Sequence, residues 1–214
     1  MKVLILYACL GGNRYKWDEV ANIEVTAVEL DPEAARLYKE RFPNDTVIVA
    51  DAHQYLLDHY KEFDFIWSSP PCPSHSRARF ARRNTTIAIY PDLKLYEEIL
   101  FLEGYFEGKW VIENVRSWYN PLIKPFELER HYFWSNFVLP KIKITNGKIE
   151  LCNGYHKEND KQQVNRFMKE FDFDLSKYNL STMKARTMLR NCVNPITGKH
   201  IFDFAFKNRQ EVLV

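Results

Sequence analysis

A single cysteine stands between prolines in the stretch SPPCPSHS, residues 69–76, at the end of the apolar run FDFIWSS. Proline restricts its own backbone and that of the residue before it, so Cys72 is held in one direction. A fixed thiol that can lose its proton is a nucleophile. Arginines follow at once, and guanidinium groups bind phosphate oxygens in pairs. The pattern predicts a cysteine nucleophile beside a phosphate-binding loop that contains Ser76, Arg77, Arg79, Arg82 and Arg83.

Other polar residues follow apolar runs in the same way: Gly11-Gly12, Glu29, Asp51 and Glu113-Asn114. The carboxyl ends of parallel strands meet at one edge of a sheet, where ligands bind. Glycines let the backbone approach a ligand closely. Acids at the ends of the second and third runs fit the hydroxyls of a ribose and the amino group of an adenine. Because neither GxxxxGK[ST] nor GxGxxG occurs, the arrangement favours S-adenosyl-L-methionine over a nucleoside triphosphate or a dinucleotide.

Strands and helices alternate through the first 115 residues. Asp31 is placed as an N-cap and Pro32 as the first residue of a helix, and a further helix is expected after the Gly11-Gly12 turn. The alternation predicts an α/β fold with a mostly parallel, doubly wound sheet. The expected strands cover 2–7, 22–30, 45–51, 63–69 and 109–115, and the expected helices between them cover 31–42, 52–60 and 92–105.

The second half of the chain is less regular. One more strand is expected over 130–140, and NGK at 146–148 indicates a hairpin turn. Acidic and aromatic residues alternate over 169–181, which we expect to lie across the surface. Two helices close the chain, the last of them beginning at Asn194-Pro195.

Composition excludes several classes of protein. The net charge of +2 makes no global case for nucleic acid, so that case depends on local clusters. No apolar run reaches the roughly 20 residues of a membrane span, and MKVLILYACL is too short for a signal peptide; a cytoplasmic protein without a membrane partner is expected. The cysteines form no CxxC pair, so neither a metal site nor a disulfide framework is expected. Cys9, Cys152 and Cys192 are interpreted as packing residues.

PPC at 70–72 followed by ENV at 113–115 resembles the DNA cytosine-5 methyltransferases, and further blocks occur in that family's order. The family's cofactor loop, DLFAGIGGFR, is matched by LYACLGGNR at 6–14. Its last block, GNAVPP, is matched by RNCVNP at 190–195. Looser matches are VELD with Glu29, VAD with Asp51, DLKLY at 92–96 and ELERHYFW with Arg130. The resemblance implies a Rossmann-like S-adenosylmethionine-dependent methyltransferase fold with a small target-recognition insertion.

That resemblance also implies three parts: a catalytic core over 1–140, a reduced target-recognition segment over 141–180 and C-terminal helices over 181–214 that return to the core. The middle part has only about 40 residues where the family carries a recognition domain. Other departures are single substitutions. Cys9 replaces the first glycine of the cofactor loop, Asn13 an aromatic residue, Pro73 the glutamine after the cysteine, and Leu128 the first arginine of its block.

The resemblance implies roles for the remaining polar residues. Cys72 would add to C6 of cytosine, and Glu113, kept protonated by burial, would donate to N3. Arg130 would contact O2 and Asn114 would hold the loop. The methyl group would pass to C5, which leaves S-adenosyl-L-homocysteine. The expected cofactor-binding residues are Ala8, Gly11, Gly12, Glu29, Leu30, Asp51, Ala52, Pro70, Asn191 and Val193.

The leading hypothesis is therefore a monomeric enzyme that acts on DNA in a bacterial or virus-infected bacterial cell. Two alternatives remain open: the same chemistry on RNA or a free cytidine nucleotide, and a catalytically silent nucleic-acid-binding homologue. The arginines favour a polymer over a nucleotide. Intact Cys72 and Glu113 favour an enzyme.

Overall fold

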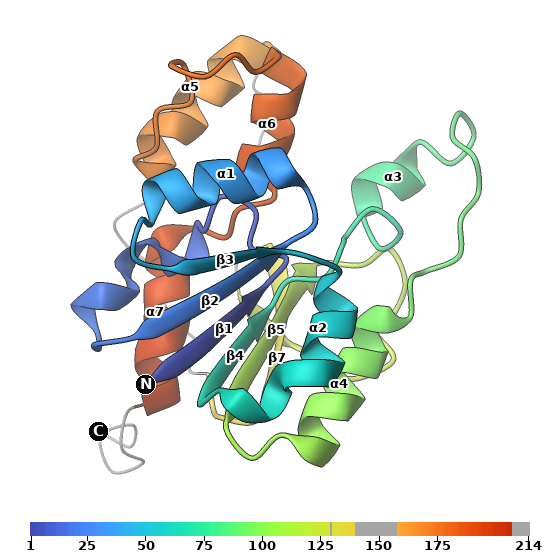
Figure 1. Cartoon of the computed structure of the whole chain (residues 1–214). Coiled ribbons are helices and arrows are strands. Elements are labelled where there is room, and N and C mark those ends of the chain that lie inside the picture. The colour runs from blue at the N-terminus through green and yellow to red at the C-terminus, as the bar shows by residue number, and fades with distance from the viewer. Residues whose placement is uncertain (129, 140–157, 207–214) are drawn as a thin grey trace, which may run out of the picture.

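The apolar runs pair into one seven-stranded sheet in the computed structural model, which describes residues 1–128, 130–139 and 158–206 (Figure 1). The strand order is β3-β2-β1-β4-β5-β7-β6. The first five strands of that order run parallel, whereas β7 is antiparallel to both of its neighbours. The strands are β1 (Lys2–Leu6), β2 (Glu24–Glu29), β3 (Thr46–Val49), β4 (Phe65–Ser68), β5 (Lys109–Val115), β6 (Phe126–Leu128) and β7 (His131–Ser135).

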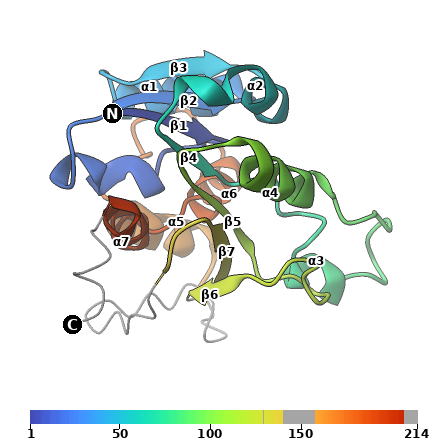
Figure 2. The same cartoon turned by 90° about the horizontal axis from the view of Figure 1, so that it is seen from below.

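Helices cover both faces of this sheet. Figure 2 shows α7 and the 3-10 helix η1 on one side of the strands and α2 with α4 on the other. Apolar residues of β1 alternate between the two faces: Val3 and Ile5 join the core under α7, and Leu4 and Leu6 join the core under α2 and α4. The helices are η1 (Asn13–Glu19), α1 (Pro32–Arg41), α2 (Ala52–His59), η2 (Tyr60–Glu62), α3 (Arg77–Ala81), α4 (Lys94–Tyr105), α5 (Asp160–Phe171), α6 (Thr182–Arg190) and α7 (Pro195–Phe206).

The order of the strands reverses between β1 and β4, because β2 and β3 lie to one side of β1 and β5 lies beyond β4. In an open parallel sheet, ligands bind outside the carboxyl ends of the strands at this switch point. Gly11 and Gly12 follow β1, and Cys72 follows β4. The fold therefore brings the predicted cofactor loop and the predicted nucleophile to one edge.

The helix starts follow the predicted signals. Asp31 caps α1, since its side chain accepts the Glu33 N–H, and Pro32 is the first helical residue. The turn after β1 leads into the 3-10 helix η1. β7 is shorter than the strand predicted over 130–140. It ends at Ser135, where the side chain of Asn136 turns back and accepts the Trp110 N–H.

Residues 169–181 lie at the surface as predicted, with most of their side chains exposed, but one face of the segment is in a core. Phe171, Phe173 and Leu175 are buried in a cluster with residues of α1 and α6, while the acidic residues between them remain exposed. The alternation thus reports a segment with one face in a core. The hairpin turn at 146–148 and Cys152 lie outside the described residues.

Candidate active site

A short turn after β4 carries Cys72. Its carbonyl oxygen accepts the N–H groups of His75 and Ser76, both at 3.0 Å, which closes the turn around the prolines. The thiol is partly exposed. Burial of the sulfur, and then the nearby carboxyl of Glu113, raise the pKa of the thiol. Cys72 therefore rests as a protonated thiol beside Glu113.

Asn114 ties this turn to β5. Its Nδ2 donates to the carbonyl oxygen of Pro70 at 2.9 Å, and its own Oδ1 accepts the Val115 N–H. Asn114 and Pro70 are both buried. An amide that serves two backbone groups at once fixes the distance between the two strand ends.

Glu113 lies near the carboxyl end of β5 and is only 6% exposed. Burial raises the pKa of its carboxyl to about 7, against the opposing influence of a hydrogen bond from Ser69 and the charge of Arg130. Near neutral pH a large fraction of Glu113 carries its proton. A neutral carboxyl can donate a hydrogen bond, which a carboxylate cannot.

His131, at the start of β7, is buried next to this acid, with its Nε2 3.6 Å from Glu113 Oε1. Burial, followed by the charges of Arg130 and Arg116, lowers the pKa of the imidazole to about 3. The imidazole is therefore neutral at the pH where Glu113 titrates and does not pull the acid into its charged form.

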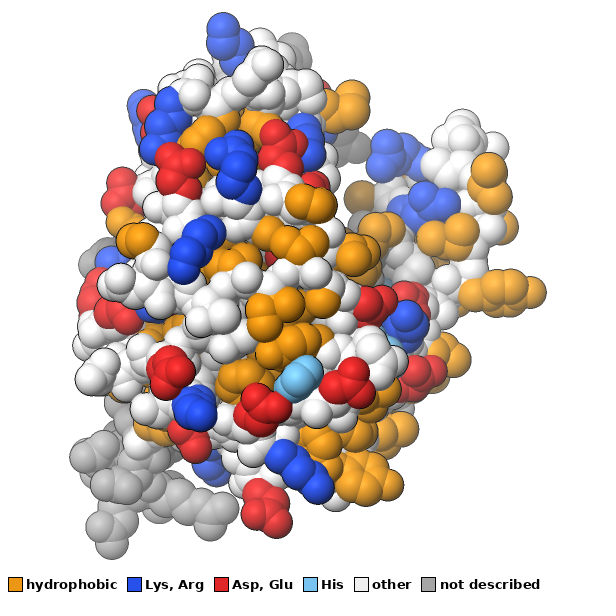
Figure 3. Space-filling model, viewed as in Figure 1, with side chains coloured by type: hydrophobic (Ala, Val, Ile, Leu, Met, Phe, Trp, Pro, Cys, Tyr) orange, Lys and Arg blue, Asp and Glu red, His pale blue; other side chains and the backbone are white. Residues whose placement is uncertain are grey.

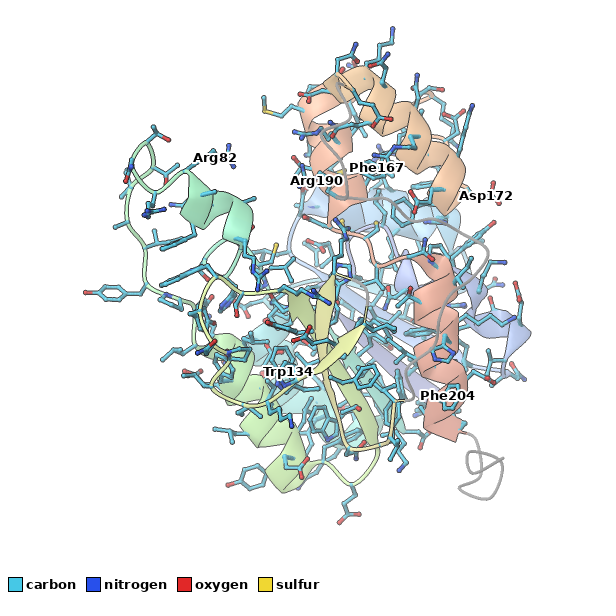
Figure 4. All side chains as sticks on the ribbon, turned by 180° about the vertical axis from the view of Figure 1, so that it is seen from behind. Arg82, Trp134, Phe167, Asp172, Arg190 and Phe204 are labelled. Atoms are coloured by element: carbon cyan, nitrogen blue, oxygen red, sulfur yellow. The ribbon has the colours of Figure 1, made fainter. Side chains whose placement is uncertain are left out.

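The charges of two arginines act on Cys72. Arg130 and Arg190 both act to lower the pKa of Cys72, although burial outweighs them. Arg130 stands just before β7, and Arg190 ends α6. Figure 4 shows Arg190 on the end of α6 nearest the strands, and Arg82 across from it, just after the projecting α3. Positive charge therefore approaches Cys72 from both halves of the chain.

On the cofactor side, Glu29 ends β2 with both carboxylate oxygens engaged. Oε2 accepts the Cys9 N–H at 2.8 Å, and Oε1 accepts the Asp31 N–H at 2.9 Å. These bonds fix the carboxylate and leave each oxygen further acceptor capacity. Such a group fits the two hydroxyls of a ribose.

The end of the neighbouring strand, β3, is exposed to solvent. Asp51 is exposed, caps α2 by accepting the Gln54 N–H, and has a lowered pKa chiefly for that reason. Leu30, which follows Glu29, is 66% exposed, and Ala52, which follows Asp51, is buried. An exposed apolar side chain at the end of one strand and a carboxylate at the end of the next fit the face and amino group of an adenine.

The first and last blocks of the chain meet at the glycines. Gly11 has a φ of +65°, and a Cβ there would lie 2.5 Å from the Phe42 ring. A Cβ on Gly12 would lie 2.5 Å from the Val193 carbonyl oxygen. Both glycines are therefore required by packing. Ala8 is also buried in this loop, whereas Asn191 is exposed at the end of α6.

The predicted phosphate-binding loop forms a projecting arm, residues 74–93, which contains α3 (Figure 1). Ser76 caps α3, and Arg77 Nε donates to the Ser117 carbonyl oxygen at 3.0 Å, which attaches the arm to the segment after β5. Arg82 and Arg83 are exposed, and among the described residues their guanidinium groups contact the carbonyl oxygens of Ala78 and Phe80 and the ring of Phe80. Figure 3 shows basic and hydrophobic side chains together on this arm.

An aromatic pair forms the base of the arm. The rings of Phe80 and Trp118 stack with their centroids 4.4 Å apart and nearly parallel, and Trp118 Nε1 donates to the Ser74 carbonyl. A shallow pocket of about 210 Å³ lies against them, and Arg79 and Arg83 also line it. Ser74 is two residues from Cys72. A planar ring with an attached anion fits these surroundings.

The sequence pattern does not single out Ser69, His131, Phe80 or Trp118, which all lie at this edge. The predicted site residues also do not include a further buried acid, Glu98 of α4. The Glu98 carboxylate accepts hydrogen bonds from Tyr7 at 2.7 Å and Ser68 at 2.6 Å, and contacts His53 at 3.0 Å. The helix itself is predicted, and the spacing of Glu98 from Leu95 and Leu102 is the signal that places it on the apolar face, away from its exposed neighbour Glu97.

Within the described residues, no group of three or more His, Cys, Asp or Glu side chains is arranged to hold a metal ion. In the same part of the chain, no helix has the length and apolar character needed to cross a membrane.

The strand order, with its reversal between β1 and β4, defines a Rossmann-like α/β fold with a mostly parallel sheet. The model of the family C-5 cytosine-specific DNA methylase matches residues 1–117, which is more than half of the chain. The chain belongs to this family.

Solved structures with a similar fold cover about a half of this chain. A DNMT2 variant from Spodoptera frugiperda is 26% identical over 53% of this chain and 35% of its own, with a TM-score of 0.41. A protein described as a prophage-encoded DNA modification methyltransferase from E. coli is 19% identical over 55% of this chain and 32% of its own, with a TM-score of 0.38. The chain thus spans about a third of the length of these relatives. A comparison with the curated proteins found no match.

Proposed function

We propose that this protein transfers a methyl group from S-adenosyl-L-methionine to C5 of cytosine in DNA, through a covalent bond between Cys72 and C6. The observation that carries the proposal is the pairing of a partly exposed thiol with a buried acid. Glu113 acts on the pKa of Cys72 and itself has a pKa of about 7. Membership of the C-5 cytosine-specific DNA methylase family supports cytosine in DNA as the substrate.

Cytosine C5 is a poor nucleophile until the ring is activated. The Cys72 thiolate adds to C6, which opens the C5–C6 double bond and moves negative charge toward N3. Glu113, in its protonated form, donates its proton to N3 and so stabilises the adduct. C5 then takes the methyl group. Loss of the C5 proton to solvent base restores the double bond and expels the thiolate, while Glu113 regains its proton from N3.

The residues at the cofactor edge fit the proposed methyl donor. When bound, S-adenosyl-L-methionine supplies an electrophilic methyl group and leaves as S-adenosyl-L-homocysteine. Glu29 would accept from the ribose hydroxyls and Asp51 from the adenine amino group. Leu30, Ala52, Ala8 and Pro70 would provide apolar contacts, and the segment with Gly11, Gly12, Asn191 and Val193 would enclose the methionine end.

A nucleic acid strand is a better substrate than a free nucleotide. Arg82 and Arg83 are exposed on the arm that follows the Cys72 turn, where they can reach phosphates. The Phe80–Trp118 pair, which is hydrogen-bonded to Ser74 two residues from Cys72, offers a surface for a neighbouring base. If the substrate is a duplex, the target base must leave the stack to reach Cys72. The division into core, reduced recognition segment and returning helices remains part of this proposal.

The proposal is tested with oligonucleotides that contain 5-fluorocytosine, because fluorine at C5 prevents release of the enzyme. The protein is incubated with cofactor and duplex DNA, single-stranded DNA, RNA or free 5-fluorocytidine nucleotide, and then separated on a denaturing gel. We expect a covalent band with DNA that requires cofactor and disappears in Cys72→Ser. A covalent band with RNA but not with DNA would mean that the substrate is RNA and not DNA. No adduct on any substrate, from protein that binds the cofactor, would favour the silent homologue.

A further inference from the structure

Two thiols that are far apart in the sequence lie in contact behind the cofactor loop. The sulfur atoms of Cys9 and Cys192 each lie 3.4 Å from the carbonyl oxygen of Met188, and the two thiols are hydrogen-bonded to each other. Cys9 is partly exposed, whereas Cys192 is buried. Neither takes part in the chemistry of Cys72.

The backbone at Cys9 makes the contact unusual. Its φ is +46°, in the left-handed region that residues with a Cβ adopt at a cost. A glycine would avoid that cost, yet the side chain present here is a thiol directed at another thiol. Cys192 is held equally firmly, since its Cβ packs against Gly12. The contact is therefore set by the backbone on both sides.

The surroundings also favour reaction. The hydrogen bond from Cys9, the charge of Arg41 and the N–H groups of Leu10 and Gly12 lower the pKa of the Cys192 thiol despite its burial. Arg41 is fixed in place, because its Nη1 donates to the Leu10 carbonyl at 3.1 Å. Cys192 is thus the better nucleophile, and Cys9 is the thiol that meets it.

We propose that Cys9 and Cys192 form a reversible disulfide under peroxide, and that this disulfide weakens binding of the methyl donor. The Cys192 thiolate attacks one oxygen of hydrogen peroxide, which breaks the O–O bond and gives a sulfenic acid and, with one proton, water. The Cys9 thiol then attacks that sulfur, the S–O bond breaks, and a second water leaves. Two thiols are oxidised by two electrons, and one peroxide is reduced to two waters.

The effect on the cofactor edge follows from the Cys9 backbone. The S–S bond is about 2.05 Å long, so its formation draws Cys9 toward α6. The Cys9 N–H is the group that holds Glu29 Oε2 at 2.8 Å. Displacing it releases the carboxylate that we assign to the ribose. This regulatory effect rests on the proposed function, whereas the disulfide itself does not.

The test uses the full chain with Cys72→Ser and Cys152→Ser, in which Cys9 and Cys192 are the only two of the four cysteines left. The protein is treated with hydrogen peroxide, and its thiols are blocked, digested and mapped by mass spectrometry without reduction. We expect a linked Cys9–Cys192 peptide that dithiothreitol removes. The proposed disulfide is wrong if Cys9 and Cys192 are each found alkylated while the same dose of hydrogen peroxide oxidises Cys72 of the unsubstituted chain.

Cofactor binding is measured on the same samples by calorimetry. We expect at least a tenfold loss of affinity for S-adenosyl-L-methionine after oxidation and full recovery with dithiothreitol. The matched control adds Cys9→Ser, which cannot form the bond and should show no loss after peroxide. Equal affinity of the linked and reduced forms would overturn the regulatory effect. If the reduced protein does not bind S-adenosyl-L-methionine, the proposed function is overturned instead. The peptide map would then still show whether the disulfide forms.

Discussion

His131 and Glu113 face each other as neutral groups, with Nε2 of one 3.6 Å from Oε1 of the other. Burial drives the two pKa values apart in the direction that keeps both uncharged, to about 3 for the imidazole and about 7 for the carboxyl. A charged imidazole at this distance would lower the pKa of Glu113 and remove its proton. The pair explains how an acid can serve as a proton donor near neutral pH.

The pH dependence of adduct formation should reveal this acid. The active form needs Cys72 without its proton and Glu113 with its proton. Since Glu113 titrates first, at about 7, the rate should rise with pH up to about 7, stay level, and fall above the raised pKa of Cys72. In Glu113→Gln the rate should be lower and keep rising through neutral pH. An unchanged inflection near 7 in this variant would assign that inflection to another group.

The same acid should cost stability at alkaline pH. Its pKa in the folded protein, about 7, lies above the ordinary value of 4.5. The folded state therefore holds the proton more tightly, and stability is lost as pH rises through that range. Relative to Glu113→Gln, the unsubstituted protein should lose about 2 to 3 kcal/mol of unfolding free energy between pH 5 and pH 8.5. Urea titrations at both pH values measure this. A constant difference would contradict the buried acid.

Glu98 should be the more important of two adjacent acids in α4. Removing its carboxylate in Glu98→Ala leaves the hydroxyls of Tyr7 and Ser68 without their acceptor. We expect a loss of about 3 kcal/mol in unfolding free energy. Glu97→Ala is the matched control, because Glu97 is exposed and should change stability by about 0.5 kcal/mol or less. Similar losses in both variants would argue against the buried network.

Two glycine substitutions should have opposite effects. Gly12→Ala places a Cβ 2.5 Å from the Val193 carbonyl oxygen and 2.7 Å from the Cys192 Cβ, so the last block must move. We expect a loss of about 2 kcal/mol or more and weaker cofactor binding. Gly104→Ala meets nothing within 4 Å inside α4 and should gain about 1 kcal/mol. Thermal unfolding compares them, and a neutral Gly12→Ala would mean that the two blocks do not pack tightly against each other.

Among the arginines of the arm, we expect Arg82 and Arg83 to bind phosphate and Arg77 to hold the arm in place. Arg82 and Arg83 are exposed, so replacing both by Ala should lower the slope of log affinity against log salt for oligonucleotides by about 0.7 to 0.9 for each phosphate that is no longer bound. Arg77→Ala is the comparison. Arg77 anchors the arm to Ser117, so its replacement should slow adduct formation with a smaller change in the slope. Equal slopes in all three proteins would exclude phosphate binding by the arm.

The parts of the fold that the sequence predicts well are those with one strong signal. Buried parallel strands appear as apolar runs, and α1 has both its cap and its proline. α5 is not among the predicted helices, although Val164, Phe167 and Phe171 recur at helical spacing and Asn159 with Gln162 forms a capping box. The polar residues between them hide the pattern. β6 has only three residues, too few for any periodicity.

The residues of the candidate site also fall into those that the sequence predicts and those that it does not. Residues at strand ends are predictable, because parallel strands must end together at one edge. His131 is not, since its place beside Glu113 depends on the antiparallel register that pairs Glu113 with Phe133 and Val115 with His131. The place of Glu98 on the apolar face of α4 can be predicted, but its partners Tyr7, Ser68 and His53 cannot, because they lie far from it in the sequence. Burial sets these pKa values. It follows from tertiary contacts and cannot be seen in the linear order of the residues.

The contact of Gly12 with the Val193 carbonyl has a consequence for biosynthesis. The ribosome delivers residue 193 long after residue 12, when Cys72 and Glu113 have already emerged. A nascent chain can therefore assemble its parallel strands early, yet it has to wait for α6 and the turn after it before the segment with Gly11 and Gly12 has its packing partner. A nascent chain thus carries Cys72 and Glu113 for some time before it has the segment that the proposed function assigns to the methyl donor.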